Sequence, residues 1–289
     1  MRRFLNIFAC ASMLLLGVDA MAQDVPDALF EYPVAPDTCS TLESRSNYVI
    51  AHFWDGFDLA KPITNDLSLV RTFRDYADLF KYGHRTVVLS SIRDLMFKLR
   101  SNTANLSKFG HVAEAVLFGP NADYWSDEVY SEFAKSLAAS SGLRKEEREY
   151  YQNQLGRISL CQEGMPLEIE YVDAVTGNKT KLSELQGNLF LVVFLDSSID
   201  SSIDRTRLVT DVRLQEVVDA GQITVVCLHE GKPAADWAGS MPEKWVKGYA
   251  TGIPYRLDVR AIPGCYMLDE EHKIMHKNIT VEDFKAALE

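Results

Sequence analysis

Cysteines are candidate functional residues, because two thiols at short spacing can bind a metal or exchange electrons. Cys10 lies in an apolar N-terminal stretch, and Cys39, Cys161, Cys227 and Cys265 are far apart in the chain. The absence of a Cys-x-x-Cys pair excludes a zinc knuckle, haem attachment and a vicinal redox dithiol. Cys39 and Cys161 flank a helical region and could form a disulfide, although spacing alone does not establish one.

A second pattern is a run of acids and hydroxyls in which Asp196, Asp200 and Asp204 recur at every fourth residue. A nucleophilic serine here would need a histidine base. The run contains none, so His229 or His276 would have to be brought close by folding. The run also lacks the glycine and terminal acid of an EF-hand loop. We favour the interpretation that its serines and aspartates cap the start of a helix.

Other residues with chemical potential have structural alternatives. His272 and His276, with Glu270, could form a metal pair because residues four apart share one face of a strand. Two exposed histidines on a hairpin are more often incidental, and no metal is expected. Two aromatic clusters are expected to pack inside the protein rather than form exposed patches: Phe53, Trp54 and Phe57, and Trp237, Trp245 and Tyr249.

The N-terminus has the layout of a secretory signal peptide. A basic start precedes an apolar stretch over residues 4–17, and Ala20-Met21-Ala22 supplies an A-x-A cleavage site. That stretch is shorter than the ~20 residues that span a bilayer, and Cys10 lies inside it, which disfavours a lipid anchor. We expect removal of residues 1–22, no membrane span afterwards, and a periplasmic or other extracytoplasmic location.

Composition and charge bound the class of protein. The 289 residues suit two domains, and 47% hydrophobic with 25% charged residues is typical of globular chains. The formal net charge is −11, from 41 acids against 30 bases. Because phosphate binding needs clustered lysine and arginine, a nucleic-acid partner is not expected.

The first half has helical periodicity. Ser40 and Glu43 form a capping box that opens a helix, Gly83 ends a later one, and Ser126 caps another. Apolar residues recur at helical spacing between these signals. The pattern predicts an all-α domain of five or six helices over residues 23–163.

After Pro166 the periodicity changes, and unbroken apolar runs alternate with a helical stretch. Such runs are typical of parallel strands covered on both faces. Cys227 lies in one of them and is expected to be a small buried hydrophobe. The pattern predicts an α/β domain over residues 164–289. Its expected strands are 167–172, a short one after the turn at 173–178, 189–195, 223–228, 264–268 and 273–277; its expected helices are 204–220, one around Trp237 and Trp245, and one from Thr280.

This order of elements resembles the thioredoxin fold with a central mixed sheet. The matching segments are Leu182–Asn188, Leu191–Leu195 and, most specifically, Asp258–Asp269 with its Ile262-Pro263 dipeptide. The half resembles exported domains related to cytochrome-maturation and disulfide-reducing proteins. In that family the Ile-Pro dipeptide holds a cis proline that presents strand edges to a substrate.

The helical half also carries a resemblance. YVIAHFWDGF at residues 48–57 and LFGPNADY at residues 117–124 are similar to a helical domain of unknown function. That domain precedes thioredoxin-like domains in Gram-negative envelope proteins. Together the two resemblances cover nearly all of the chain after the signal peptide.

The departure from the family concerns its reactive cysteines. Redox-active members carry Cys-x-x-Cys directly after the central strand, at a helix start that lowers a thiol pKa. Here Ser198 and Ser201 occupy those positions, or Ile199 and Ser202 in a register one residue later. Hydroxyls cannot carry two electrons, so the resemblance implies a degenerate site without dithiol exchange.

We therefore expect a non-catalytic binding or assembly protein of the cell envelope, with an unidentified protein or peptide partner and no cofactor. The alternative is a monothiol oxidoreductase or isomerase that uses Cys265, two residues after Pro263. The competing interpretation of Cys265 is a strand residue facing the core, which we favour. A structural role through the helical domain would change only where the partner binds.

Overall fold

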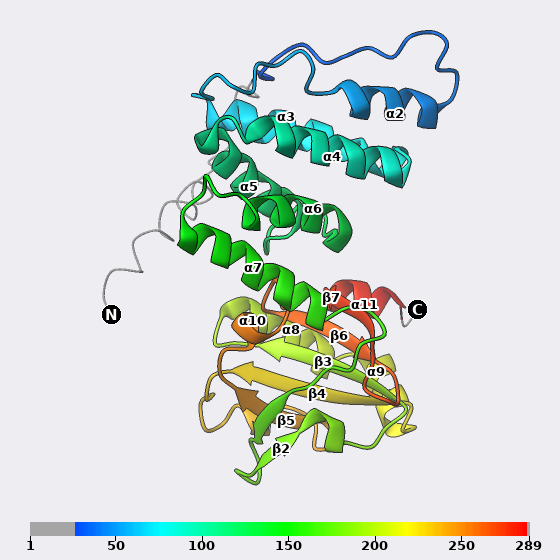
Figure 1. Ribbon diagram of the computed structural model, residues 1–289. Helices are drawn as coiled ribbons and strands as arrows, with labels where there is room; N and C mark the ends of the chain where they lie inside the picture. The colour runs from blue at the N-terminus through cyan, green and yellow to red at the C-terminus, as the bar shows by residue number, and fades with distance from the viewer. Residues whose placement is uncertain (1–26, 288–289) are drawn as a thin grey trace, which may run out of the picture.

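The computed structural model describes residues 27–287. They form a stack of helices followed by a twisted sheet with its own helices (Figure 1). The signal peptide expected at residues 1–22, with cleavage near Ala22, lies outside the described residues. Within the described part, none of the helices has the length and apolarity needed to cross a bilayer.

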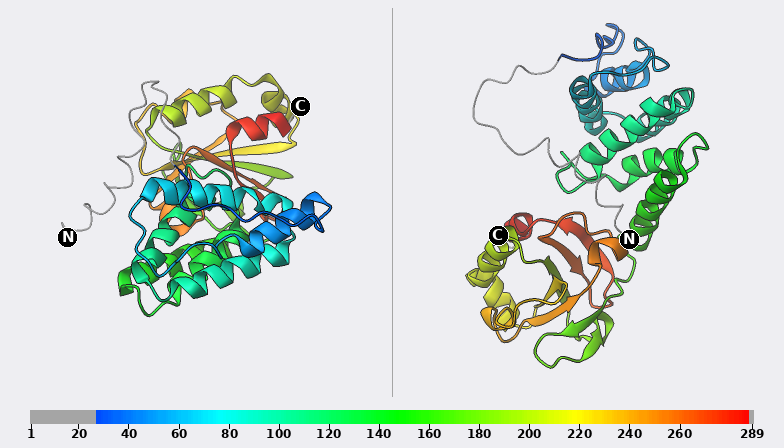
Figure 2. Two further views of the ribbon diagram at one scale, coloured as in Figure 1. Left: turned by 90° about the horizontal axis from the view of Figure 1, so that it is seen from above. Right: turned by 90° about the vertical axis from the view of Figure 1, so that its left-hand side faces the viewer.

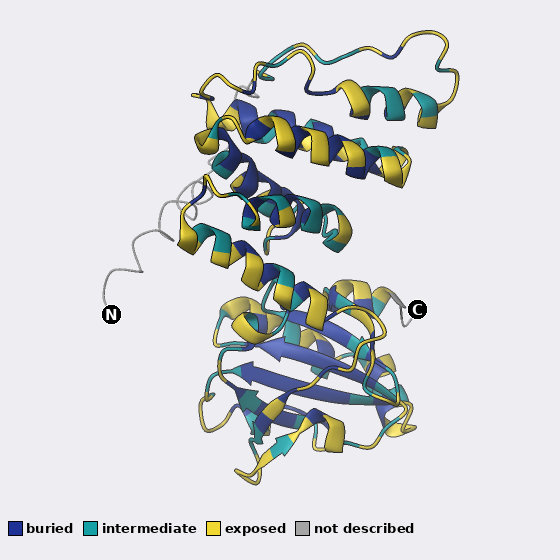
Figure 3. Cartoon of the chain, viewed as in Figure 1, coloured by how far each residue is buried: buried dark blue, intermediate teal, exposed yellow. Residues whose placement is uncertain are grey.

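The helical half has one apolar core. Phe53 and Trp54 are buried in it and Phe57 packs against it, as expected for that aromatic cluster. The buried stripes of successive helices face one another in Figure 3. The helices of this half are α2 (Leu42–His52), α3 (Asp66–Asp78), the 3-10 turn η1 (Phe80–Tyr82), α4 (Arg85–Leu99), α5 (Thr103–Leu117), α6 (Asp127–Ala138) and α7 (Lys145–Leu160).

The cap of α2 differs from the expected capping box by one residue. Thr41, not Ser40, is the N-cap, and its Oγ1 accepts from the Ser44 backbone N–H at 3.0 Å. The Ser44 hydroxyl oxygen in turn accepts from the Thr41 N–H. Serine thereby fills the role expected of Glu43, because its short side chain reaches the N-cap equally well. Ser126 caps α6 as predicted.

The second half contains a mixed seven-stranded sheet in the order β2-β1-β5-β4-β3-β6-β7. The central strands β3, β4 and β5 are parallel, and β6 runs antiparallel to β3. The elements are β1 (Glu170–Asp173), β2 (Lys179–Lys181), η2 (Leu182–Glu184), β3 (Leu189–Leu195), α8 (Ile199–Val209), α9 (Val212–Asp219), β4 (Ile223–Glu230), η3 (Ala238–Ser240), β5 (Val246–Ala250), α10 (Ile253–Arg256), β6 (Gly264–Leu268), β7 (Ile274–Ile279) and α11 (Val281–Ala287).

Each face of this sheet has its own core. One face packs against α8, α9 and α11, and the other packs against α10 and the end of α7. Because β3 and β4 are covered on both faces, both are unbroken apolar runs. Figure 2 shows α8, α9 and α11 gathered on one side of the sheet.

Two expectations for this half are wrong. No regular helix includes Trp237 and Trp245; a 3-10 turn and the strand β5 occupy that region. Both indole rings are nevertheless buried, so the loop places them in the core without helical periodicity. The helix expected at 204–220 begins earlier and is broken, because Asp211 caps α9 by accepting from the Leu214 N–H at 3.0 Å.

The two halves meet through buried polar contacts. The Arg157 side chain of α7 donates to the Pro254 carbonyl, and the Cys161 sulfur accepts from the Asp258 N–H at 3.4 Å. Cys161 belongs to the core of the sheet domain, although it directly follows the last helix of the helical half. It is a free thiol, as is Cys39, so the disulfide considered for this pair is not formed.

Candidate functional site

The candidate site lies where β3 ends and β6 begins. Strand β3 stops at Leu195, and α8 starts at Ile199 after a short turn. Phe194 pairs with Gly264 in the antiparallel register of β3 and β6. The next residue, Pro263, therefore lies at the same edge of the sheet as the start of α8. The Ile262–Pro263 peptide bond is cis.

The Asp196 carboxylate organises the turn before α8. Its Oδ1 atom accepts from the Ser198 N–H at 2.9 Å, from the Ser198 hydroxyl, and from the Ser201 hydroxyl at 2.7 Å. The Asp196 N–H donates to the Ser201 Oγ at 3.0 Å. Ser198 is the N-cap of α8, and its Oγ accepts from the Ser201 N–H. Both serines are therefore held by Asp196 in a closed network.

The electrostatics follow from this network. Burial acts to raise the pKa of Asp196, but the hydrogen bonds donated by Ser198 and Ser201 outweigh burial. The pKa of this carboxyl is consequently below its ordinary value. An ionised Asp196 that already accepts several hydrogen bonds supports the capping interpretation of the segment.

The other aspartates of the run do not gather around a common point. Asp204 pairs with Arg207 at 3.1 Å, and Asp200 is exposed. Among residues 27–287, no cluster of three or more histidine, cysteine, aspartate or glutamate side chains is arranged to hold a metal.

His272 and His276, the two histidines near Glu270, also contact different residues. The His272 ring stacks on Phe190, with ring centroids 4.5 Å apart. His276 is exposed and lies 3.5 Å from the Glu163 carboxylate. The two rings thus have different partners and do not form the metal pair that was the less favoured interpretation of the sequence.

Ser197, which no sequence motif distinguishes from the other serines of the run, lies next to a histidine. The Ser197 Oγ and His229 Nε2 atoms are 3.4 Å apart, and His229 Nδ1 is 2.9 Å from the Gly231 carbonyl oxygen. The sequence offers His229 only as a distant base that folding could bring close. Leu195 pairs with His229 across β3 and β4, so Ser197, two residues after Leu195, lies close to His229. The register of these two strands is the signal that could have identified Ser197.

Cys265 is a core residue. Its side chain is 0% exposed, and burial raises the pKa of its thiol far above the ordinary value. Cys227 is also fully buried, and burial raises the pKa of its thiol to about 12. Since the thiolate is the reactive form, the structure supports the core interpretation of Cys265. It contradicts the alternative of a reachable residual thiol.

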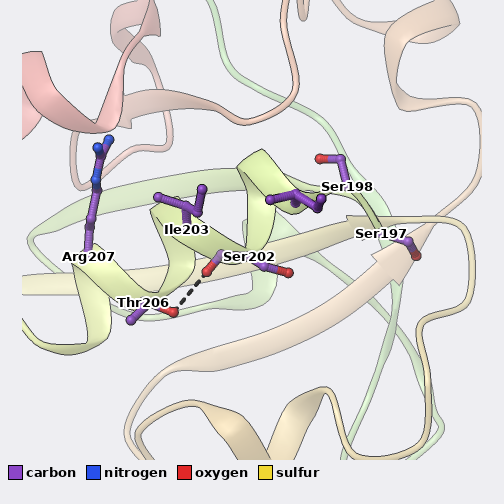
Figure 4. Close-up of a pocket in the computed structure, with 7 residues that line it drawn as sticks. Ser197, Ser198, Ser202, Ile203, Thr206 and Arg207 are labelled. Atoms are coloured by element: carbon purple, nitrogen blue, oxygen red, sulfur yellow. Dashed lines mark hydrogen bonds between the residues drawn. The ribbon is translucent and has the colours of Figure 1, made fainter.

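An open hollow of about 450 Å³ runs along the exposed side of α8 (Figure 4). Ile199 is 78% exposed and Ile203 is 45% exposed, one helical turn apart on this surface. These two side chains form the apolar part of the surface along the hollow. The residues lining the hollow are Ser197, Ser198, Ile199, Ser202, Ile203, Thr206 and Arg207.

Both halves of the chain are similar to known proteins. Residues 17–160 match a family described as a domain of unknown function, DUF5106. The structure is similar to that of a thioredoxin-like protein from Bacteroides caccae, with a TM-score of 0.78 and 19% identity. That similarity covers 91% of this chain and 99% of the other.

Shorter proteins resemble part of the chain. A thiol:disulfide interchange protein from Bacteroides sp. matches 45% of this chain and 89% of its own, with 20% identity and a TM-score of 0.37. A domain of a possible thiol-disulfide isomerase from Cytophaga hutchinsonii matches 44% and 90%, with 20% identity and a TM-score of 0.33. None of the curated proteins matches the sequence. The chain thus joins a DUF5106 domain to a C-terminal domain of thioredoxin-like fold.

Proposed function

We propose that this is an exported binding or assembly protein whose thioredoxin-like half does not perform thiol–disulfide exchange. One observation carries the proposal: where β3 meets α8, the hydroxyls of Ser198 and Ser201 are bound to Asp196, and the nearby sulfur of Cys265 is buried. Two-electron exchange requires an accessible thiolate. The alternative monothiol activity of Cys265 has no support from its position.

The partner we propose is an extended protein or peptide segment. The half-buried Ile262 and Pro263 lie in the loop that leads into β6, a strand already paired with β3 and β7. Backbone groups of this loop, rather than of the paired strand, can bind an extended segment, and neighbouring apolar side chains can give the pairing specificity. Ile199 and Ile203 on α8, the helix that follows β3, provide exposed apolar side chains.

Export remains an expectation from the sequence, and we propose that the mature chain begins at Gln23 in the bacterial periplasm. Cell fractionation followed by N-terminal sequencing tests this directly. A mature protein that keeps residues 1–22, or that is found in the cytoplasm, would refute it.

Insulin reduction by dithiothreitol tests the absence of exchange. The protein should leave the rate at background. The double variant Ser198→Cys/Ser201→Cys should raise the rate, because it restores paired sulfurs at the start of α8. Turnover by the native protein that disappears in Cys265→Ser would overturn the proposal.

A peptide without reactive thiols tests binding. The probe is fluorescein-labelled, carboxymethylated insulin B chain, followed by anisotropy. We expect saturable binding that Ile203→Glu weakens at least tenfold, because the added carboxylate would be desolvated under an apolar segment. Val175→Glu is the matched control, since Val175 is exposed on the turn between β1 and β2. Equal weakening by both variants, or no binding at all, would contradict this role.

A further inference from the structure

We infer that Ser197 and His229 form a nucleophile–base pair that accepts the acyl group of small esters. This activity goes beyond the proposed binding role and does not depend on it. It uses a serine different from Ser198 and Ser201, whose hydroxyls are occupied by Asp196. The Ser197 side chain is exposed at the start of the hollow along α8.

Strand geometry accounts for the pairing. Leu195 and His229 are partners across the parallel strands β3 and β4. Ser197 lies two residues beyond Leu195, in the turn that leaves β3, and this turn places its hydroxyl beside the His229 ring. The 3.4 Å separation of Ser197 Oγ and His229 Nε2 is long for a hydrogen bond. Such pairs are often loose until a substrate is bound.

The His229 ring is oriented for the role of base. The Gly231 carbonyl oxygen can only accept, so the Nδ1 atom 2.9 Å away carries the proton of the neutral ring. The Nε2 lone pair is then free to face the Ser197 hydroxyl. The edge of the Trp237 ring packs against the imidazole at a centroid distance of 5.3 Å and helps to fix the ring. A base held by an orienting acceptor is what activation of a serine requires.

The surroundings favour the negative charge that would develop. Ser197 lies next to Ser198, the N-cap of α8, and the first-turn N–H groups of this helix at Ile199 and Asp200 have no acceptor within the helix. These groups and the helix dipole would stabilise an oxyanion.

The chemical step balances without an added cofactor. Ser197 Oγ attacks the carbonyl carbon of the ester, and its proton passes to His229 Nε2. The bond between the carbonyl carbon and the leaving oxygen breaks, and His229 returns the proton to the leaving alcohol. Water then attacks the acyl-serine in the same way and restores the free hydroxyl. The apolar side chains of Ile199 and Ile203 along the hollow favour short aliphatic acyl groups.

Hydrolysis of p-nitrophenyl acetate by the full protein tests the inference. The native protein should release p-nitrophenol and form an acetylated peptide containing Ser197, detected by mass spectrometry. Ser197→Ala should lower kcat/KM about 100-fold and abolish the adduct, within the range expected for a nucleophile with a general base. Ser183→Ala is the matched control, since Ser183 is an exposed serine of the same domain that does not line the hollow, and it should leave both unchanged.

His229→Gln should reduce the rate as strongly as Ser197→Ala. Because His229 is buried, this variant counts only if its circular dichroism is native; otherwise the Ser197 and Ser183 variants decide. An unchanged rate in Ser197→Ala, or acetylation confined to other residues, would overturn the inference. Binding of the carboxymethylated insulin B chain should persist in Ser197→Ala, so failure of the esterase activity and failure of the binding role are distinguishable.

Discussion

Arg260 of the sheet domain donates to the Asp127 carboxylate of the helical domain while its guanidinium lies 4.5 Å from the Phe118 ring centroid. Asp127 also pairs with Lys277 at 2.7 Å, and Asp258 faces both cations from within the sheet domain. The Arg260 side chain is only 2% exposed. These two acids and two bases thus form one ionic network that joins the domains. Its arginine, Arg260, lies three residues before Pro263.

The Asp127→Ala substitution should therefore destabilise the protein by about 3 kcal/mol, because it leaves two largely buried cations facing a single acid. Urea unfolding followed by circular dichroism measures the change. Glu128→Ala is the matched control: Glu128 pairs with the exposed Arg85, and loss of a surface pair should cost less than about 1 kcal/mol. Equal effects of the two substitutions would contradict the importance of the domain contact.

Glu114 should make the helical domain less stable as the pH rises. Burial raises the pKa of Glu114 and outweighs the opposing hydrogen bonds from Tyr150 and Gln154. A raised carboxyl pKa contributes stability that is fully present below the unfolded pKa, about 4.3, and is lost as the pH rises through the folded value. Glu114→Gln keeps an acceptor oxygen and removes the charge. Its stability relative to the native protein should therefore increase between pH 4 and pH 7.

Urea midpoints at several pH values measure this difference, with the exposed Glu146→Gln as control. If Glu114→Gln and the native protein show parallel pH profiles, the carboxyl does not carry the expected penalty.

Ser201 should contribute to stability through Asp196. Ser201→Ala removes a buried hydroxyl that donates to the carboxylate and accepts from the Asp196 N–H, a loss of about 1–3 kcal/mol. The lowered pKa of Asp196 provides stability above the unfolded pKa, about 3.9, and this stability is lost as the pH falls through the folded value. The deficit of Ser201→Ala should therefore be largest near neutral pH and shrink below pH 4. The exposed Ser202→Ala should show no such deficit in thermal unfolding at either pH.

Thiol accessibility should separate Cys39 from Cys161, Cys227 and Cys265 in the proposed mature chain, which begins at Gln23. Cys39 is half-buried, whereas Cys161, Cys227 and Cys265 are buried and all four are free. Ellman's reagent should react rapidly with one thiol in the native protein and with four in urea. Cys39→Ser should remove the rapid phase. A rapid phase that survives in Cys39→Ser and disappears in Cys265→Ser would show that the buried position of Cys265 is wrong.

Much of the sheet could be predicted because buried parallel strands need apolar residues on both faces. Strands β3 and β4 are such runs. Strand β5 has no comparable run, and it forms because its backbone pairs with β4 and β1. Gly248 permits this pairing: a Cβ there would lie 2.2 Å from Cδ2 of Tyr171. A close approach between distant segments leaves no periodic trace in the sequence.

In the candidate site, too, the local features could be predicted from the sequence and the long-range contacts could not. The position of Ser198 at the start of a helix follows from local capping chemistry, which depends on neighbouring residues. The proximity of Ser197 to His229 depends on the register of two strands, and the domain contact of Arg260 joins residues more than a hundred positions apart. Residue types alone carry no information about such pairings.

The row Cys227–Val193–Cys265 runs across three neighbouring strands, so one valine lies between two sulfur-bearing residues. The fold keeps these sulfurs apart and dry, but an unfolded chain would not. In an oxidising medium, unfolding would let them crosslink wrongly, and the trapped species could not return without a reductant. In such a medium, resistance to thiol crosslinking would then be set by how rarely this sheet opens.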